Sequence, residues 1–186
     1  MAYEPRNMAP GRGGPPGQRA PSGVASGAPS PRASSSDGGS RTREIEEALR
    51  PPPQPPVYFA PNSAAVRAEL LDDEAQRTAR ALAPIPASQL RRFYTEVMAL
   101  KRRLELATTG IPDDEVQAQM ALLKAKAAYT CRRQDRYPIE LVRFFTRHAA
   151  AVKGRNDFQR GFQPHFEAVM AYHRVFEKDK KGSGEA

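Results

Sequence analysis

The first 61 residues constrain the fold most, because they hold most of the residues that interrupt helices and strands and very few that could form a core. Of the 18 prolines, 13 lie at or before Pro61, and 8 of the 13 glycines precede residue 40. The first 44 residues contain no Ile, Leu, Phe or Trp. Such a segment cannot bury enough apolar surface to offset the conformational entropy lost on folding. We therefore predict a disordered tail and Pro-rich spacer over residues 1–61, a folded domain over residues 62–178 and a polar tail over residues 179–186.

After residue 61, apolar residues recur with the spacing of an α-helix in five segments, which Pro and Gly residues separate. No segment shows a strand pattern of convincing length. The predicted fold class is therefore all-α, a bundle of about five helices with a long disordered N-terminal tail. The predicted helices run from Asn62 or Ser63 to about Leu82, from Ser88 to about Thr108, from Asp113 or Asp114 to about Arg133, from Pro138 to about Val152, and from Asn156 to the polar tail.

The periodicity also predicts which helix faces are buried. In the third segment Leu122 and Tyr129 form a second apolar stripe, and a helix that is apolar on two sides is typical of the buried centre of a bundle. Phe144 lies off the apolar face of the fourth segment and is predicted to make an external contact.

Pro164 lies opposite the apolar side of the fifth segment and is predicted to kink it. Ser88 is predicted to cap the second helix.

Sequence patterns typical of catalysis are absent: there is no Gly-rich phosphate loop, no HExxH and no nucleophile elbow. His148, His165 and His173 are far apart in sequence and are predicted to be core or boundary histidines. We therefore predict no enzyme activity, no metal site and no cofactor. Cys131 is the only cysteine, so an intrachain disulfide is excluded. The chain shows no membrane-spanning run and no signal-peptide core, which predicts a cytoplasmic protein with no membrane partner.

Positive charge is concentrated in the predicted domain, where residues 84–178 contain 17 Lys and Arg against 10 Asp and Glu. A folded basic surface favours nucleic acid or another polyanion as partner. Guanidinium groups on rigid helices suit phosphate, which they contact without reading sequence. The alternative is a solvated face neutralised by neighbouring carboxylates. The basic residues on helix faces or next to them, which are the candidate RNA-binding residues, are Arg91, Arg92, Arg102, Arg103, Lys124, Lys126, Arg132, Arg133, Arg136, Arg143 and Arg147.

Two other functions fit a basic helical bundle. One is a general nucleic-acid-binding protein, such as a DNA-binding regulator, which would need a helix-turn-helix with a recognition helix. No helix after the short connection between Arg133 and Pro138 presents the usual cluster of Asn, Gln and Arg. The other is a protein-interaction scaffold whose basic face meets an acidic partner.

Three motifs carry a resemblance to a known family. They are SQLRRFY at residues 88–94, LKAKAAYTCRR at 123–133, and F-x3-F-x3-FEAVMAY at 158–172. In this order and spacing they resemble the small subunit of the type III-A CRISPR effector, the Csm complex. The resemblance covers about residues 86–176 and excludes the N-terminal tail.

The resemblance implies a non-catalytic helical bundle, several copies of which stack along the effector in antiviral defence. Such subunits line a basic channel that holds target RNA where it pairs with the guide RNA, while a different subunit cleaves the RNA. The implied partners are target RNA, the guide–target duplex, the other effector subunits and like copies of the chain. The motifs match Arg91, Lys124, Lys126 and Arg133 to basic positions of the family. The remaining candidates rest on their helix faces alone.

Overall fold

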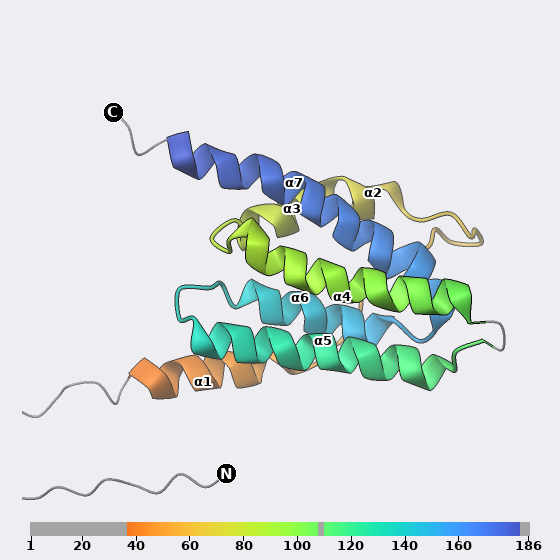
Figure 1. The fold of residues 1–186 in the computed structure, drawn as a ribbon, viewed down its shortest axis with the longest axis horizontal. Coiled ribbons are helices and arrows are strands. Elements are labelled where there is room, and N and C mark those ends of the chain that lie inside the picture. Colours follow the sequence, from red (N-terminus) through yellow and green to blue (C-terminus); the bar gives the residue numbers. More distant parts are fainter. Residues whose placement is uncertain (1–36, 108–109, 183–186) are drawn as a thin grey trace, which may run out of the picture. The chain divides into compact units, whose positions relative to one another are not determined.

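The computed structural model describes residues 37–107 and 110–182, with side chains from residue 38 to residue 177, and this part of the chain is helical (Figure 1). Its only β feature is an isolated antiparallel bridge between Phe59 and Val66. The all-α prediction is therefore confirmed. The elements are α1 (Asp37–Ala48), α2 (Ala68–Leu71), α3 (Asp73–Leu82), α4 (Ala87–Leu106), α5 (Asp113–Arg133), α6 (Glu140–Ala151), the π-helix η1 (Asp157–Phe162) and α7 (Gln163–Gly182). None of these helices is long and apolar enough to cross a bilayer.

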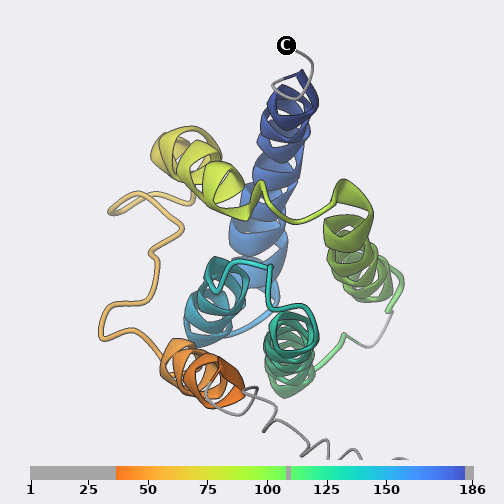
Figure 2. The same ribbon diagram turned by 90° about the vertical axis from the view of Figure 1, so that its left-hand side faces the viewer.

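Two helices, α6 and α7, organise the packing (Figure 2). The last helix, α7, packs against α2, α3 and α4, while α6 packs against α1, α3 and α5. Between them lies an aromatic core that joins α6, η1 and α7, and in it ring centroids lie 5.0–6.4 Å apart. This spacing suits offset and edge-to-face packing. The core rings belong to Phe93, Phe144, Phe145, Phe158, Phe162 and Phe166.

The central helix of the bundle is α6, whereas the sequence pattern predicted α5. On α5, Leu122 and Tyr129 are 49% and 66% exposed, so the second apolar stripe is on the surface. On α6, Phe144 is only 2% exposed, so the predicted external contact is wrong. Both differences have one cause: α6 has neighbours on several sides, whereas the side of α5 that bears Leu122 is not covered.

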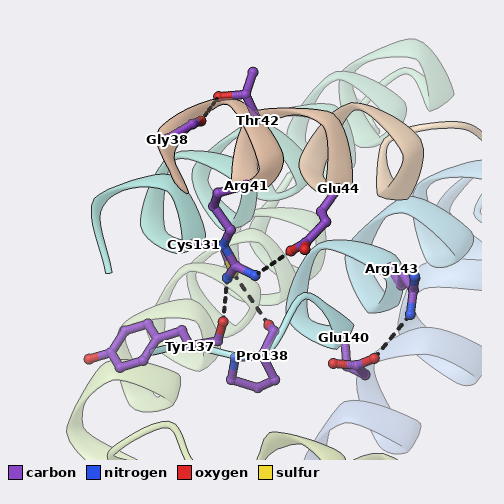
Figure 3. A network of polar contacts seen from close by, with 9 residues as sticks. All are labelled: Gly38, Arg41, Thr42, Glu44, Cys131, Tyr137, Pro138, Glu140 and Arg143. Carbon is purple, nitrogen blue, oxygen red and sulfur yellow. Dashed lines mark hydrogen bonds and ion pairs between the residues drawn. The ribbon is translucent and has the colours of Figure 1, made fainter. Parts of the chain in front are cut away.

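Part of the predicted N-terminal tail is folded. Helix α1 buries Ile45 and Ala48, and the extended segment after it buries Tyr58 in the core. Figure 3 shows how α1 is held: the Arg41 guanidinium donates a hydrogen bond to the Tyr137 carbonyl oxygen and pairs with Glu44. A few apolar residues are enough to hold α1 in place because α5 and α6 supply the apolar surface on which they pack. The predicted disorder of residues 1–36 lies outside the described residues.

Several helix boundaries differ from the prediction. The first predicted helix begins at Ala68 instead of Asn62 or Ser63, and Asn62 has a positive φ of 57°. It is also divided into α2 and α3, because Asp72 leaves helical geometry with φ −116° and ψ −95°. Pro86 occupies the N-cap position of α4, and the Ser88 side chain makes no capping hydrogen bond. Before Pro164 the chain forms η1 rather than an ordinary turn, and the Gln163 N–H donates to the Phe158 carbonyl, five residues back.

Gly161 of η1 lies against Tyr58, and no room is left for a side chain at this position. A Cβ atom there would lie under 3.0 Å from the Tyr58 side chain. Gly161→Ala is therefore expected to destabilise the fold by about 1–3 kcal/mol through overpacking. Urea unfolding followed by circular dichroism measures this change. The matched control is Gly39→Ala in α1, where nothing lies within 4 Å of the added methyl group. Equal unfolding midpoints for the two variants would contradict the close contact with Tyr58.

Candidate nucleic-acid interface

A polar cleft lies between the N-terminal part of α4 and the C-terminal part of α5, with a volume of about 310 Å³. Helix α4 contributes Gln89 and Arg92, and α5 contributes Tyr129, Thr130 and Arg133. Gln134 and Tyr137, which follow α5, also line the cleft. No carboxylate lines it, and in the described part of the chain neither arginine forms an ion pair. The cleft therefore presents two uncompensated positive charges beside an exposed aromatic ring.

Further along the same two helices the predicted basic residues are neutralised. The Lys126 Nζ atom lies 2.6 Å from a Glu96 carboxylate oxygen, and an Arg103 nitrogen lies 3.0 Å from Glu115. Both pairs join α4 to α5 at the surface, where an ion pair contributes about 0–1 kcal/mol. The structure thus brings Arg92 and Arg133 together but gives Lys126 and Arg103 carboxylate partners.

Arg143 and Arg147 line a groove between α3 and α6, together with Arg77 and the carboxylates of Glu74 and Glu140. Arg143 is exposed and pairs with Glu140 at 3.0 Å.

Arg147, which the sequence placed on an outward face, is half-buried. It donates to Thr78 Oγ1 at 3.2 Å and lies over the Phe144 ring at 5.4 Å. Burial lowers the pKa of its guanidinium from the usual range. Its contacts are those of a residue that joins α6 to α3.

The other candidates lie on different parts of the surface. Lys124 is half-buried in a groove next to α6, on another side of α5 from Lys126. Arg132 faces α1, because a Cβ atom at Gly38 would lie 3.8 Å from it. Arg136 is exposed in the connection before α6, over the Tyr137 ring at 5.7 Å.

Arg91 and Arg102 are both exposed, and their spacing of 11 positions places them on one line of α4. Arg102 lines a shallow groove with Met98 and Lys101. Arg91 does not line the cleft that holds Arg92, since neighbouring residues of a helix point about 100° apart.

The three histidines are buried, and each hydrogen-bonds within the protein, as predicted for core histidines. His148 Nδ1 lies 2.8 Å from the Tyr58 hydroxyl, His165 Nδ1 lies 2.5 Å from the Leu70 carbonyl, and His173 Nε2 lies 3.2 Å from the Leu82 carbonyl. Among the described residues no group of three or more His, Cys, Asp or Glu side chains could hold a metal ion.

Burial also sets the chemistry of these core groups. It lowers the pKa of His148 far below its usual value and that of His165 to about 4. It raises the pKa of Tyr58, and it raises that of the Cys131 thiol to about 11. These groups are neutral at physiological pH and hold the fold together.

Sequence reasoning did not identify Gln89, Tyr129 and Gln134 as members of the candidate interface. Helical spacing contains the necessary signal, because Tyr129 and Arg133 are four residues apart and Gln89 and Arg92 are three apart. Tyr129 was assigned to the core because an aromatic residue in an apolar stripe usually packs there. Whether Tyr129 is exposed depends on where α4 lies, and the apolar periodicity of α5 alone does not predict that position.

The comparison with protein families distinguishes the effector subunit from the other basic helical proteins considered above. The model of the family described as Csm2 Type III-A matches residues 65–179, which is more than half of the chain. The chain belongs to this family. It is therefore a member of the small-subunit family of the type III-A CRISPR effector, as the three motifs indicated. The comparisons with curated proteins and with solved structures found no match to the chain.

The family match covers α2 to α7 and the whole α4/α5 cleft, but it leaves out α1 and the segment that contains Tyr58. The candidate interface thus lies in the part of this family member that defines the family. Helix α1 lies outside the match and packs on α5 and α6.

Proposed function

We propose that this chain is the non-catalytic small subunit that contacts target RNA in a type III-A effector, with Arg92 and Arg133 as the principal phosphate-binding residues. The observation that carries the proposal is the α4/α5 cleft, which has two arginines without carboxylate partners on rigid helices. Arginine side chains held in this way bind phosphate oxygens with two hydrogen bonds and lose little side-chain entropy. Family membership supports RNA rather than another polyanion as the ligand.

The proposal includes the setting of the subunit. Several copies stack along the effector next to its other subunits, and together they hold the target RNA where it pairs with the guide, in antiviral defence in the cytoplasm. Exposed large apolar side chains on α5 and α7, Leu122 and Val175, support contacts with further protein. Catalysis belongs to other subunits in this proposal, which family membership and the burial of all three histidines support.

Single substitutions Arg92→Ala and Arg133→Ala test the phosphate contacts. Each is expected to weaken RNA binding by the full-length chain about fivefold, equivalent to about 1 kcal/mol. The loss should be the same for RNAs of different sequence, because phosphate contacts do not read bases. The slope of log K against log salt should also shrink by about 0.7 for each contact with single-stranded RNA. Fluorescence anisotropy with labelled RNA over a series of salt concentrations measures both quantities.

Arg174→Ala is the matched control, because it removes the same charge from an exposed position on α7 outside the cleft. It should leave the affinity almost unchanged. Equal affinity and equal salt slope for the Arg92 variant, the Arg133 variant and the control would overturn the assignment of the cleft. Binding that depends on the sequence of duplex DNA would instead favour a DNA-binding regulator.

A further inference from the structure

The α4/α5 cleft contains more than the charges needed for a phosphate backbone. Tyr129 is 66% exposed, and in the described part of the chain it makes no contact with another aromatic ring and no hydrogen bond through its hydroxyl group. An exposed aromatic ring offers a face for stacking, and this ring lines the same cleft as two arginines. The ring therefore has an open face in a basic, polar surrounding.

The cleft also carries neutral hydrogen-bonding groups. Gln89 lies on α4, Gln134 follows α5, and both amides line the cleft, as does the Thr130 hydroxyl. Each amide offers two N–H donors and a carbonyl acceptor, which is the set that base edges require. The volume of about 310 Å³ lies at the lower end of the range of roughly 300–1,000 Å³ for small-ligand sites.

We propose that this cleft holds one unstacked nucleotide of the RNA, with its base stacked on the Tyr129 ring and its flanking phosphates on Arg92 and Arg133. The amides of Gln89 and Gln134 then hydrogen-bond the base edge or the sugar. This inference rests on the proposed RNA-binding function and specifies the site more closely. It requires a nucleotide that is free to leave its neighbours, since a base inside a duplex has no face to offer.

The polar lining favours a nucleotide over a partner protein as the occupant. A protein interface is most apolar and least charged at its centre. Here Tyr129 lies instead among Arg92, Arg133 and two amides, and the closest carboxylate on this side of α4, that of Glu96, is bound to Lys126. The exposed apolar residues of α5, such as Leu122, lie outside the cleft.

The test compares Tyr129→Ala with Tyr129→Phe in the full-length chain, with fluorescently labelled RNA as the probe in single-stranded and fully paired forms. Stacking on an aromatic side chain predicts that Tyr129→Ala weakens single-stranded RNA binding roughly 5- to 150-fold. Tyr129→Phe keeps the ring and should bind as the unaltered chain does. Neither variant removes a charge, so the salt slope should stay the same, and affinity for the paired RNA should not change.

Val57→Ala serves as the control, because it truncates an exposed apolar side chain outside the cleft. Salt-dependent RNA binding that Tyr129→Ala leaves intact would overturn the nucleotide site and leave the proposed function standing. Loss of self-association in sedimentation by Tyr129→Ala, with RNA affinity preserved, would assign the ring to a protein contact and also overturn the site. No salt-dependent RNA binding by the unaltered chain would overturn the proposed function itself.

Discussion

Phe144→Ala is expected to lower the free energy of unfolding by about 3–5 kcal/mol, the usual cost of removing a phenylalanine from a packed core. The Phe144 ring is 2% exposed, and its centroid lies 5.2 Å from that of Phe145 and 5.5 Å from that of Phe166. Its contact with His148 is closer, at 4.5 Å. Truncation would leave a cavity bordered by three helical segments, which cannot all move in to fill it. Urea unfolding of the purified chain measures the loss.

Two variants make this result specific to Phe144. Leu122→Ala truncates a side chain that is 49% exposed and should change stability by no more than about 0.5 kcal/mol. Phe144→Leu preserves most of the apolar volume and should cost less than Phe144→Ala. A small effect of Phe144→Ala, similar to that of Leu122→Ala, would mean that the ring faces solvent, as helical periodicity alone predicts.

This contrast shows where sequence reasoning is sufficient for the fold. Helices α4 and α5 match the predicted segments within two residues, because apolar periodicity and Pro residues agree on their limits, and α5 also has an acidic first turn. The prediction of α5 as the central helix is wrong because the central helix is the one that other helices surround, and the sequence of a single helix does not show how many helices pack on it. The sequence of α6 shows one dominant apolar face, yet Thr146 and His148 outside the usual apolar set are also buried.

The candidate interface was predictable in part for a related reason. Spacing along a helix places Arg92 and Arg103 on one side of α4, and Lys126 and Arg133 on one side of α5. It does not say that Glu96 and Glu115 lie opposite Lys126 and Arg103, which the antiparallel course of α4 and α5 brings about (Figure 1). These ion pairs neutralise one end of the α4/α5 surface, whereas the arginines of the cleft at the other end keep their charge uncompensated among the described residues.

The folded segment before residue 62 shows a different limit. Helix α1 follows a stretch with hardly any core-forming residues, so its composition predicts disorder. Its stability comes from outside itself: Arg41 reaches the Tyr137 carbonyl oxygen (Figure 3), and Ile45 and Ala48 are buried against the bundle. Tyr58, beyond the Pro-rich run, is anchored by the His148 ring. Docking of this kind cannot be read from local composition.

The anchoring of Tyr58 also predicts how stability depends on pH. The His148 and His165 ring centroids lie 5.0 Å apart, and the partners around them are the Tyr58 hydroxyl, the Leu70 carbonyl and the Arg147 guanidinium. Burial is the main reason that the pKa of both histidines is low, and for His148 the neighbouring positive charges of His165 and Arg147 add to it. Both imidazoles therefore remain neutral in the folded protein well below pH 6.5.

The sign of the effect follows from which state binds protons. Below pH 6.5 the histidines of the unfolded chain become charged, while the folded chain stays neutral until the pH approaches about 4 for His165. Stability is therefore complete above pH 6.5 and is lost as the pH falls. Between pH 7.5 and pH 5 each histidine should contribute a loss of about 2 kcal/mol, because the unfolded chain gains about one proton per group that the folded chain does not bind.

Urea unfolding at several pH values between 7.5 and 5 measures this loss in the unaltered chain and in His148→Gln. The glutamine keeps a polar partner for the Tyr58 hydroxyl but does not titrate, so the slope of unfolding free energy against pH should fall by about one proton. The range ends at pH 5 because carboxylates titrate below it. Stability that does not change between pH 6.5 and 5, or the same slope in both proteins, would show that the His148 ring is not held neutral in the core. In that case the contact between His148 and Tyr58 would not be what attaches the N-terminal segment to the bundle.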